Sequence, residues 1–253
     1  MLLIHSTNLD SMVAAATIIN NIREIYPKID QYAKEPCTDR RFSFNNDPEY
    51  QQIDCNLGTF KSKFISTVSV NDAIKSALEN NETVLIVGFS PDFTKEPFSQ
   101  FYQPKTDLIW IDHHQSSVDF IKSEIGSQLR YKGLISVQRS SAYLTWVFFH
   151  QNDVYNGELW KMPKVITLAD DYECNVCELG GHYLNAALYY TKEMYDPCCN
   201  IWSNLLNDDI DHLASIMEYG KSVFVGKKLE RNVNNRSNRG RISAIPKSIY
   251  DSE

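Results

Sequence analysis

The stretch Leu108-Ile109-Trp110-Ile111-Asp112-His113-His114 places a short apolar run directly before three side chains that can bind metal or phosphate. Four consecutive apolar residues of mainly β-branched and aromatic type predict a strand that is buried on both faces. Two similar runs end at polar clusters: Leu2-Leu3-Ile4 precedes His5, and residues 83–87 precede Gly88. The carboxyl ends of parallel strands meet at one edge of a sheet, where ligands of open α/β folds bind. The three strand ends therefore predict one binding site built from distant parts of the chain.

The segments around these runs predict an α/β fold. Apolar residues recur at helical spacing in residues 12–25, 72–78, 140–150, 164–168 and 201–233. Within the last of these segments, Gly220 is expected to break the helix. Strands that are separated by helices indicate a mostly parallel sheet flanked by helices.

The chain is expected to divide into three parts. Residues 1–200 would form the α/β domain, and residues 201–240 a helical linker whose end is the polar run 232–240. Residues 241–253 would begin a further subdomain, a cap that is either reduced or truncated, and its first strand would cover residues 241–245.

Composition and charge exclude several classes of partner. The chain has 253 residues, of which 43% are hydrophobic and 23% charged, as in globular proteins. Its formal net charge of -7 argues against binding of duplex DNA, which needs a basic surface. No apolar run approaches the ~20 residues of a membrane span, and His5 follows Met1 too soon for a signal peptide. We expect a cytoplasmic protein without a membrane partner, located in the host cytoplasm or the virion if a phage encodes it.

Together, these motifs resemble those of the DHH phosphoesterase superfamily. The triplet Asp112-His113-His114 follows a buried strand, as in that family. The N-terminal His5-Ser6-Thr7-Asn8-Leu9-Asp10 is similar to phage-type versions of its first motif, and residues 139–146 resemble the helix after the triplet. The likeness covers residues 1–230.

The resemblance implies a metal-dependent phosphoesterase with a DHH domain. It implies that His5 and Asn8 bind one ion, and that Asp10, His113 and Asp170 bind the other. The ions would be Mn²⁺, with Mg²⁺ as the alternative.

The same resemblance implies that Asp112 and His114 are catalytic, serving the phosphate and orienting the neighbouring imidazole. The implied partner is a nucleotide or a short single-stranded nucleic acid. Asp170 is preferred to Asp171 as the last ligand, because it directly follows the apolar pair Leu168-Ala169.

Three positions depart from the family pattern. The family has Asp at positions 8 and 88 and usually Gly at position 11, where this chain has Asn8, Gly88 and Ser11. Two dications held ~3.5 to 4 Å apart repel each other by on the order of 15 to 20 kcal/mol at an effective dielectric constant of 20. A bridging carboxylate normally offsets that repulsion. We therefore expect one tightly bound ion, held by Asp10, His113 and Asp170, rather than two. Asp92 is a less favoured substitute for the missing bridge.

Two functions of different class therefore stay open. The preserved His5, Asp10 and Asp170 favour a phosphoesterase that is weakened at Asn8 and Gly88. The absence of a carboxylate at position 88 favours a catalytically inactive protein, retained for nucleotide binding or as a structural component with a protein assembly partner. Nearby, residues 140 and 141, both serine, are expected to cap a helix rather than to contact phosphate.

Overall fold

The computed structural model describes residues 1–25, 50–56, 59–65, 67–96, 98–103, 107–173 and 179–237. The strands are β1 (Leu2–His5), β2 (Tyr50–Asn56), β3 (Thr59–Ile65), β4 (Val84–Val87) and β5 (Leu108–Ile111). The α-helices are α1 (Leu9–Ile25), α2 (Thr67–Glu79), α3 (Gln115–Lys122), α4 (Ser141–Phe149), α5 (Gln151–Tyr155), α6 (Lys164–Glu173), α7 (Gly181–Tyr190), α8 (Asn200–Leu206) and α9 (Ile210–Ser237). Single turns of 3-10 helix cover Phe98–Tyr102, Gly126–Gln128, Leu159–Lys161 and Lys192–Tyr195.

The five strands form one sheet in the order β3-β2-β1-β4-β5. β1, β4 and β5 are parallel neighbours, which confirms the expected parallel sheet for the three apolar runs. The hairpin of β2 and β3 was not predicted; β2 pairs antiparallel with both β1 and β3. Because β3 therefore runs in the same direction as β1, only β2 points the other way.

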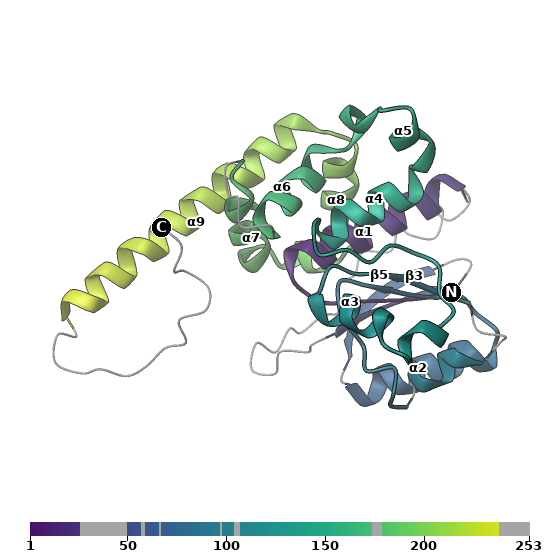
Figure 1. The fold of residues 1–253 in the computed structure, drawn as a ribbon. Helices are drawn as coiled ribbons and strands as arrows, with labels where there is room; N and C mark the ends of the chain where they lie inside the picture. The colour runs from purple at the N-terminus through teal and green to yellow at the C-terminus, as the bar shows by residue number, and fades with distance from the viewer. Residues whose placement is uncertain are drawn as a thin grey trace.

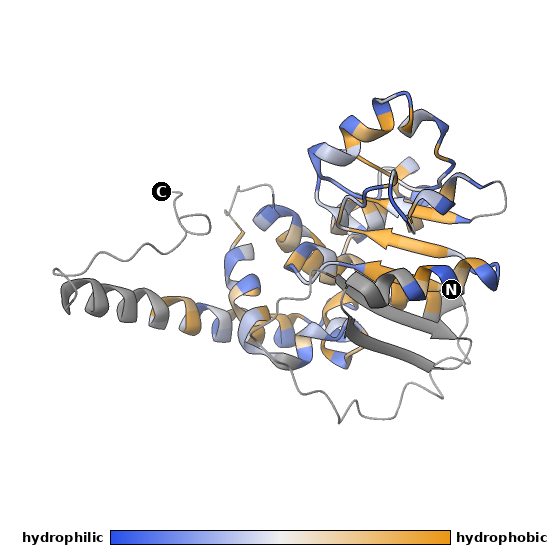
Figure 2. Ribbon diagram, turned by 90° about the horizontal axis from the view of Figure 1, so that it is seen from below, coloured by the Kyte–Doolittle hydropathy of each residue, from blue (hydrophilic) through white to orange (hydrophobic). Residues whose placement is uncertain are grey.

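Helices cover both faces of this sheet (Figure 1). Alternate strand residues such as Leu3 and Leu85 pack against α1 and α4, whereas their neighbours Ile4 and Ile86 pack on the opposite side with α2. That second side also holds an aromatic group around Trp110. The central strands consist mainly of hydrophobic residues (Figure 2). Burial on both faces explains why these strands read as continuous apolar runs.

A further layer of helices lies beyond α1 and α4. α6, α7, α8 and α9 enclose a buried cluster with the outer faces of α1 and α4. The boundary expected at residue 200 falls at the start of α8, where Trp202 and Leu205 are buried in that cluster. α8 therefore packs with the helices of residues 1–200.

The expected helix break at Gly220 is wrong, because α9 continues through this residue. A Cβ atom at Gly220 would lie 2.8 Å from the carbonyl carbon of Tyr183 in α7, so the glycine permits close approach of two helices. The interruption lies instead at residues 207–209, between α8 and α9. The polar run that was expected as a linker is helical as far as Ser237.

The expected subdomain in residues 241–253, with its first strand at 241–245, lies outside the described residues. Among the helices in the described ranges, none combines the length and apolarity needed to cross a membrane.

Candidate metal and phosphate site

The carboxyl ends of β1, β4 and β5 lie in register. His5 pairs with Val87, and Val87 pairs with Ile111, so the polar clusters that follow these strands share one edge of the sheet. A backbone hydrogen bond also fixes the position of Asp112 after β5, because the amide of Asp112 donates to the carbonyl of Leu134. The predicted convergence of strand ends is therefore present.

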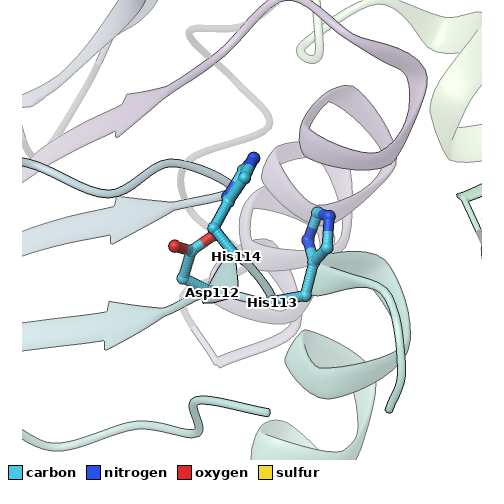
Figure 3. A group of neighbouring side chains, drawn as sticks. All are labelled: Asp112, His113 and His114. Carbon is cyan, nitrogen blue, oxygen red and sulfur yellow. The ribbon is translucent and has the colours of Figure 1, made fainter. Parts of the chain in front are cut away.

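The triplet Asp112, His113 and His114 stands directly after β5 (Figure 3). Asp112 is fully buried; its Oδ1 accepts a 2.7 Å hydrogen bond from Nδ1 of His114, and its Oδ2 accepts one from the hydroxyl of Ser117. The hydrogen bond to Asp112 outweighs partial burial and raises the pKa of His114, whose side chain is 42% exposed. One potential ligand atom from each triplet residue lies within 4.8 Å of the others, so the group could hold a metal ion.

The N-terminus of α4 holds two carboxylates from distant parts of the chain. The amides of Ser141 and Ala142 donate to Oδ2 and Oδ1 of Asp10 at 3.0 and 2.7 Å. The amide of Ser140 donates to Oδ1 of Asp170 at 2.8 Å. The free amides and the positive dipole end of a helix favour anions at this place. One helix end therefore brings Asp10 and Asp170 together. Their proximity was expected from the sequence, but the helix end that causes it was not.

His113 joins this pair. Its Nδ1 lies 2.8 Å from the hydroxyl oxygen of Ser141 and 3.2 Å from Oδ2 of Asp10. Its Nε2 lies 3.1 Å from Oε1 of Glu173. Burial disfavours a charged ring, but hydrogen bonds and ion pairs with Asp10 and Glu173 outweigh it and raise the pKa of His113 to about 10. Without a bound ion, His113 is therefore an imidazolium at neutral pH.

Glu173 is a site residue that the sequence reasoning missed. It lies three residues after Asp170 in α6, a spacing that puts both side chains on one face of the helix. That spacing was the available signal.

The environment of His5 lowers the pKa of its ring, whereas the environment of His113 raises it. Its Nδ1 donates to the carbonyl of Ser6 at 2.7 Å, whereas its Nε2 is buried without a hydrogen-bond partner. Burial lowers the pKa of His5 to about 4, so the ring is neutral and carries a free lone pair on Nε2. A histidine that donates one ring N–H to a backbone carbonyl and offers the other nitrogen has the usual arrangement of a metal ligand. Among the described residues, His5 hydrogen-bonds to neither Asp10 nor His113.

Asn8, the remaining predicted ligand, has a structural role. Its Oδ1 accepts a 2.8 Å hydrogen bond from the amide of Ser11, and its carbonyl accepts one from Met12, so Asn8 caps α1. Its role as a ligand stays a prediction.

Of the two serines that were expected to cap a helix, Ser140 does so and Ser141 does not. Ser140 is the N-cap of α4, since its hydroxyl accepts from the amide of Tyr143, while the hydroxyl of Ser141 contacts His113. Arg139, just before the cap, forms a 2.9 Å ion pair with Oδ2 of Asp170.

Two other acidic residues considered from the sequence lie elsewhere. Asp171 accepts hydrogen bonds from the amides of Leu179 and Gly181 at the start of α7, which leaves Asp170 as the residue at α4. Asp92 is bound within its own exposed turn: hydrogen bonds from Thr94, and then Lys95, lower its pKa to about 2. Nothing in this geometry supports Asp92 as a substitute for a carboxylate at position 88.

Among the described residues, the triplet is the group of three side chains whose ligand atoms lie within 4.8 Å of one another. Outside the triplet, two further donor atoms suit a divalent cation. The buried Nε2 atom of His5 lacks a hydrogen-bond partner, and Oδ1 of Asp10 has a second lone pair beside its one amide bond. Oδ2 of Asp10 contacts both the amide of Ser141 and the ring of His113. Imidazole nitrogen with carboxylate oxygen suits first-row divalent ions such as Mn²⁺. No protein-family model, curated protein or solved structure matches the chain.

Proposed function

We propose that this chain is a DHH-type, metal-dependent phosphoesterase-like protein that acts on nucleotides or short single-stranded oligonucleotides through one divalent ion. The observation that carries the proposal is the buried, unpartnered Nε2 of His5 at the strand edge that also presents Asp112, His113 and His114. Leaving a buried polar atom unpaired costs about 1–3 kcal/mol, and a bound cation would remove that cost.

The proposed ion keeps the expected ligands Asp10, His113 and Asp170. The proposal adds His5, which the resemblance assigns to a separate ion, because its Nε2 atom is buried without a hydrogen-bond partner. A bound Mn²⁺, or Mg²⁺, would supply a Lewis acid that polarises a phosphoryl oxygen. His113 must release a proton and turn from one of its carboxylate partners in order to bind. With neutral His113, the three carboxylates of Asp10, Asp170 and Glu173 are balanced by Arg139 and a single dication. A second dication would leave excess positive charge, which supports one ion rather than two.

The phosphate group would contact the exposed side of the triplet. Asp112 fixes His114 through Nδ1 and favours its charged form, so the half-exposed ring can donate from Nε2 to an anion. Arg139 is half exposed beside Asp170 and offers a second cationic group at the same helix end. These two residues would orient a nucleotide phosphate toward the ion.

A second candidate function is supported by Gly88. With no carboxylate at this position, the site lacks a bridge between two ions. The chain would then bind a nucleotide without hydrolysing it, or serve as a structural component with a protein assembly partner. The preserved ligand set also fits this reading, because one ion suffices to bind a phosphate.

The direct test measures Mn²⁺-dependent hydrolysis of bis(p-nitrophenyl) phosphate and of short oligonucleotides. The proposal expects slow hydrolysis that is lost with chelator and falls at least about 100-fold in His5→Asn, which retains a donor toward Ser6. Asp119→Asn, on the exposed face of α3, is the matched control and should keep the wild-type rate. Nucleotide binding without turnover would favour the second candidate, and an equal rate in His5→Asn would contradict the proposal.

A further inference from the structure

A buried serine connects two of the strand ends of the site, those of β1 and β4. Ser11 is fully buried in the first turn of α1, and its hydroxyl accepts a 2.7 Å hydrogen bond from Ser6 after β1. The same hydroxyl donates to the carbonyl of Gly88 after β4 at 3.2 Å. The amide of Gly88 in turn donates to the carbonyl of Ile111 in β5. The serine side chain therefore occupies the space between the first two strand ends.

Gly88 cannot accept a side chain while Ser11 has one. A Cβ atom at Gly88 would lie 2.7 Å from Cβ of Ser11 and closer still to its hydroxyl oxygen. Gly88 also has a φ of +70°, a backbone conformation that side chains disfavour. Two separate obstacles thus keep position 88 free of a side chain: the backbone conformation and the volume of Ser11.

We infer that Ser11 and Gly88 are a matched pair that closes the position of a second metal ion and dedicates the centre to one. Relative to the DHH pattern, the side chain has moved from position 88, where a carboxylate would bridge two ions, to position 11. A neutral hydroxyl cannot balance a second dication. The inference rests on the proposed function for its metal part, whereas the steric coupling between positions 11 and 88 does not require any ion.

The steric part is tested by a double-mutant cycle measured by urea unfolding in the presence of chelator. The variants are Gly88→Ala, Ser11→Gly and the two combined. Gly157→Ala is the matched control, because Gly157 has a φ of +76° and nothing within 4 Å of an added Cβ. It should therefore report backbone strain alone, about a tenfold rise in the unfolding constant.

Gly88→Ala should raise the unfolding constant at least about tenfold more than this control, and Ser11→Gly should recover that excess in the double variant. Equal effects of Gly88→Ala and Gly157→Ala, or strictly additive effects within the cycle, would overturn the pairing. If Gly88→Ala does not fold, the double variant must fold; failure of both would also overturn it.

The metal part is tested by counting Mn²⁺ ions per chain in the wild type, in Gly88→Asp and in Ser11→Gly/Gly88→Asp. We expect one ion in the wild type, no second ion in Gly88→Asp, and a second ion in the double variant. A second ion in Gly88→Asp alone, or none in the double variant, would overturn closure by Ser11. A wild type that binds no ion contradicts the proposed function instead, and the unfolding cycle still decides the steric coupling.

Discussion

His5 ends β1 and His113 follows β5 at the same edge of the sheet, yet their surroundings hold the two rings in opposite charge states. His5 is fully buried, and this burial outweighs its hydrogen bond to the carbonyl of Ser6 and lowers its pKa to about 4. His113 lies between Asp10 and Glu173, which raise its pKa to about 10. In the proposed metal centre, His5 would bind a cation in its neutral form, whereas His113 would first have to lose a proton. Binding of a metal ion should therefore strengthen as pH rises.

The largest expected effect comes from removing the carboxylate that holds His113. In Asp10→Ala, the amides of Ser141 and Ala142 and the His113 ring lose a buried acceptor. The free energy of unfolding should fall by close to the upper end of the ~3–5 kcal/mol range for breaking a buried ion pair. Urea unfolding with chelator measures this, and Asp119→Asn should match the wild type. A decrease in the free energy of unfolding of less than about 1 kcal/mol would contradict a buried ion pair between Asp10 and His113.

The next effect is the alkaline dependence that His113 confers on the metal-free protein. Its folded pKa of about 10 lies above the unfolded value of 6.5, so its stabilisation is complete below pH 6.5 and is lost as pH rises through 10. The loss should be on the order of 4 kcal/mol. His113→Gln should remove this dependence, which unfolding curves between pH 6.5 and 10 would measure. Parallel curves for wild type and variant would show that the ring is not held charged.

His5 should make the stability of the protein depend on pH in the acid range. Its folded pKa of about 4 lies below 6.5, so the stability associated with a neutral His5 is present above pH 6.5 and is lost as pH falls through 4. The loss should be on the order of 3 kcal/mol. Because carboxylates also titrate here, the quantity to measure is the difference between wild type and His5→Asn. A constant difference across this window would mean that His5 is hydrated.

The smallest effect tests the second carboxylate of His113. Glu173→Gln removes a partly exposed ion pair, so we expect a loss of about 1 kcal/mol at neutral pH and a lower pKa of His113. An NMR titration of the His113 ring measures the pKa. Glu124→Gln, at an exposed position after α3, is the control. An unchanged pKa in Glu173→Gln would assign the whole shift to Asp10.

The sequence predicted the parts of the fold that rest on local periodicity. β1, β4 and β5 are buried on both faces and read as apolar runs, and α1, α2, α4 and α6 show helical spacing. The hairpin of β2 and β3 was missed because Tyr50–Asn56 and Thr59–Ile65 mix polar and apolar residues. Gly220 was misread because a glycine in a helical pattern indicates either a break or a close approach, and only the position of α7 decides between them.

The sequence also predicted some residues of the site and missed others. Asp10, His113 and Asp170 were expected together, and the N-terminus of α4 brings them together. Glu173 was missed because its contact with His113 depends on how α6 packs beside the end of β5. The fit of Ser11 against Gly88 likewise depends on tertiary packing, although both departures were visible in the sequence.

The central claim is that one divalent ion is bound with the Nε2 atom of His5 as a ligand. It is tested most directly by titrating Mn²⁺ into metal-free protein at pH 8 and counting bound ions by EPR spectroscopy, in the wild type and in His5→Asn. We predict one ion per chain in the wild type and at least about 100-fold weaker binding in His5→Asn. Two ions in the wild type, or equal affinity in both proteins, would contradict the claim.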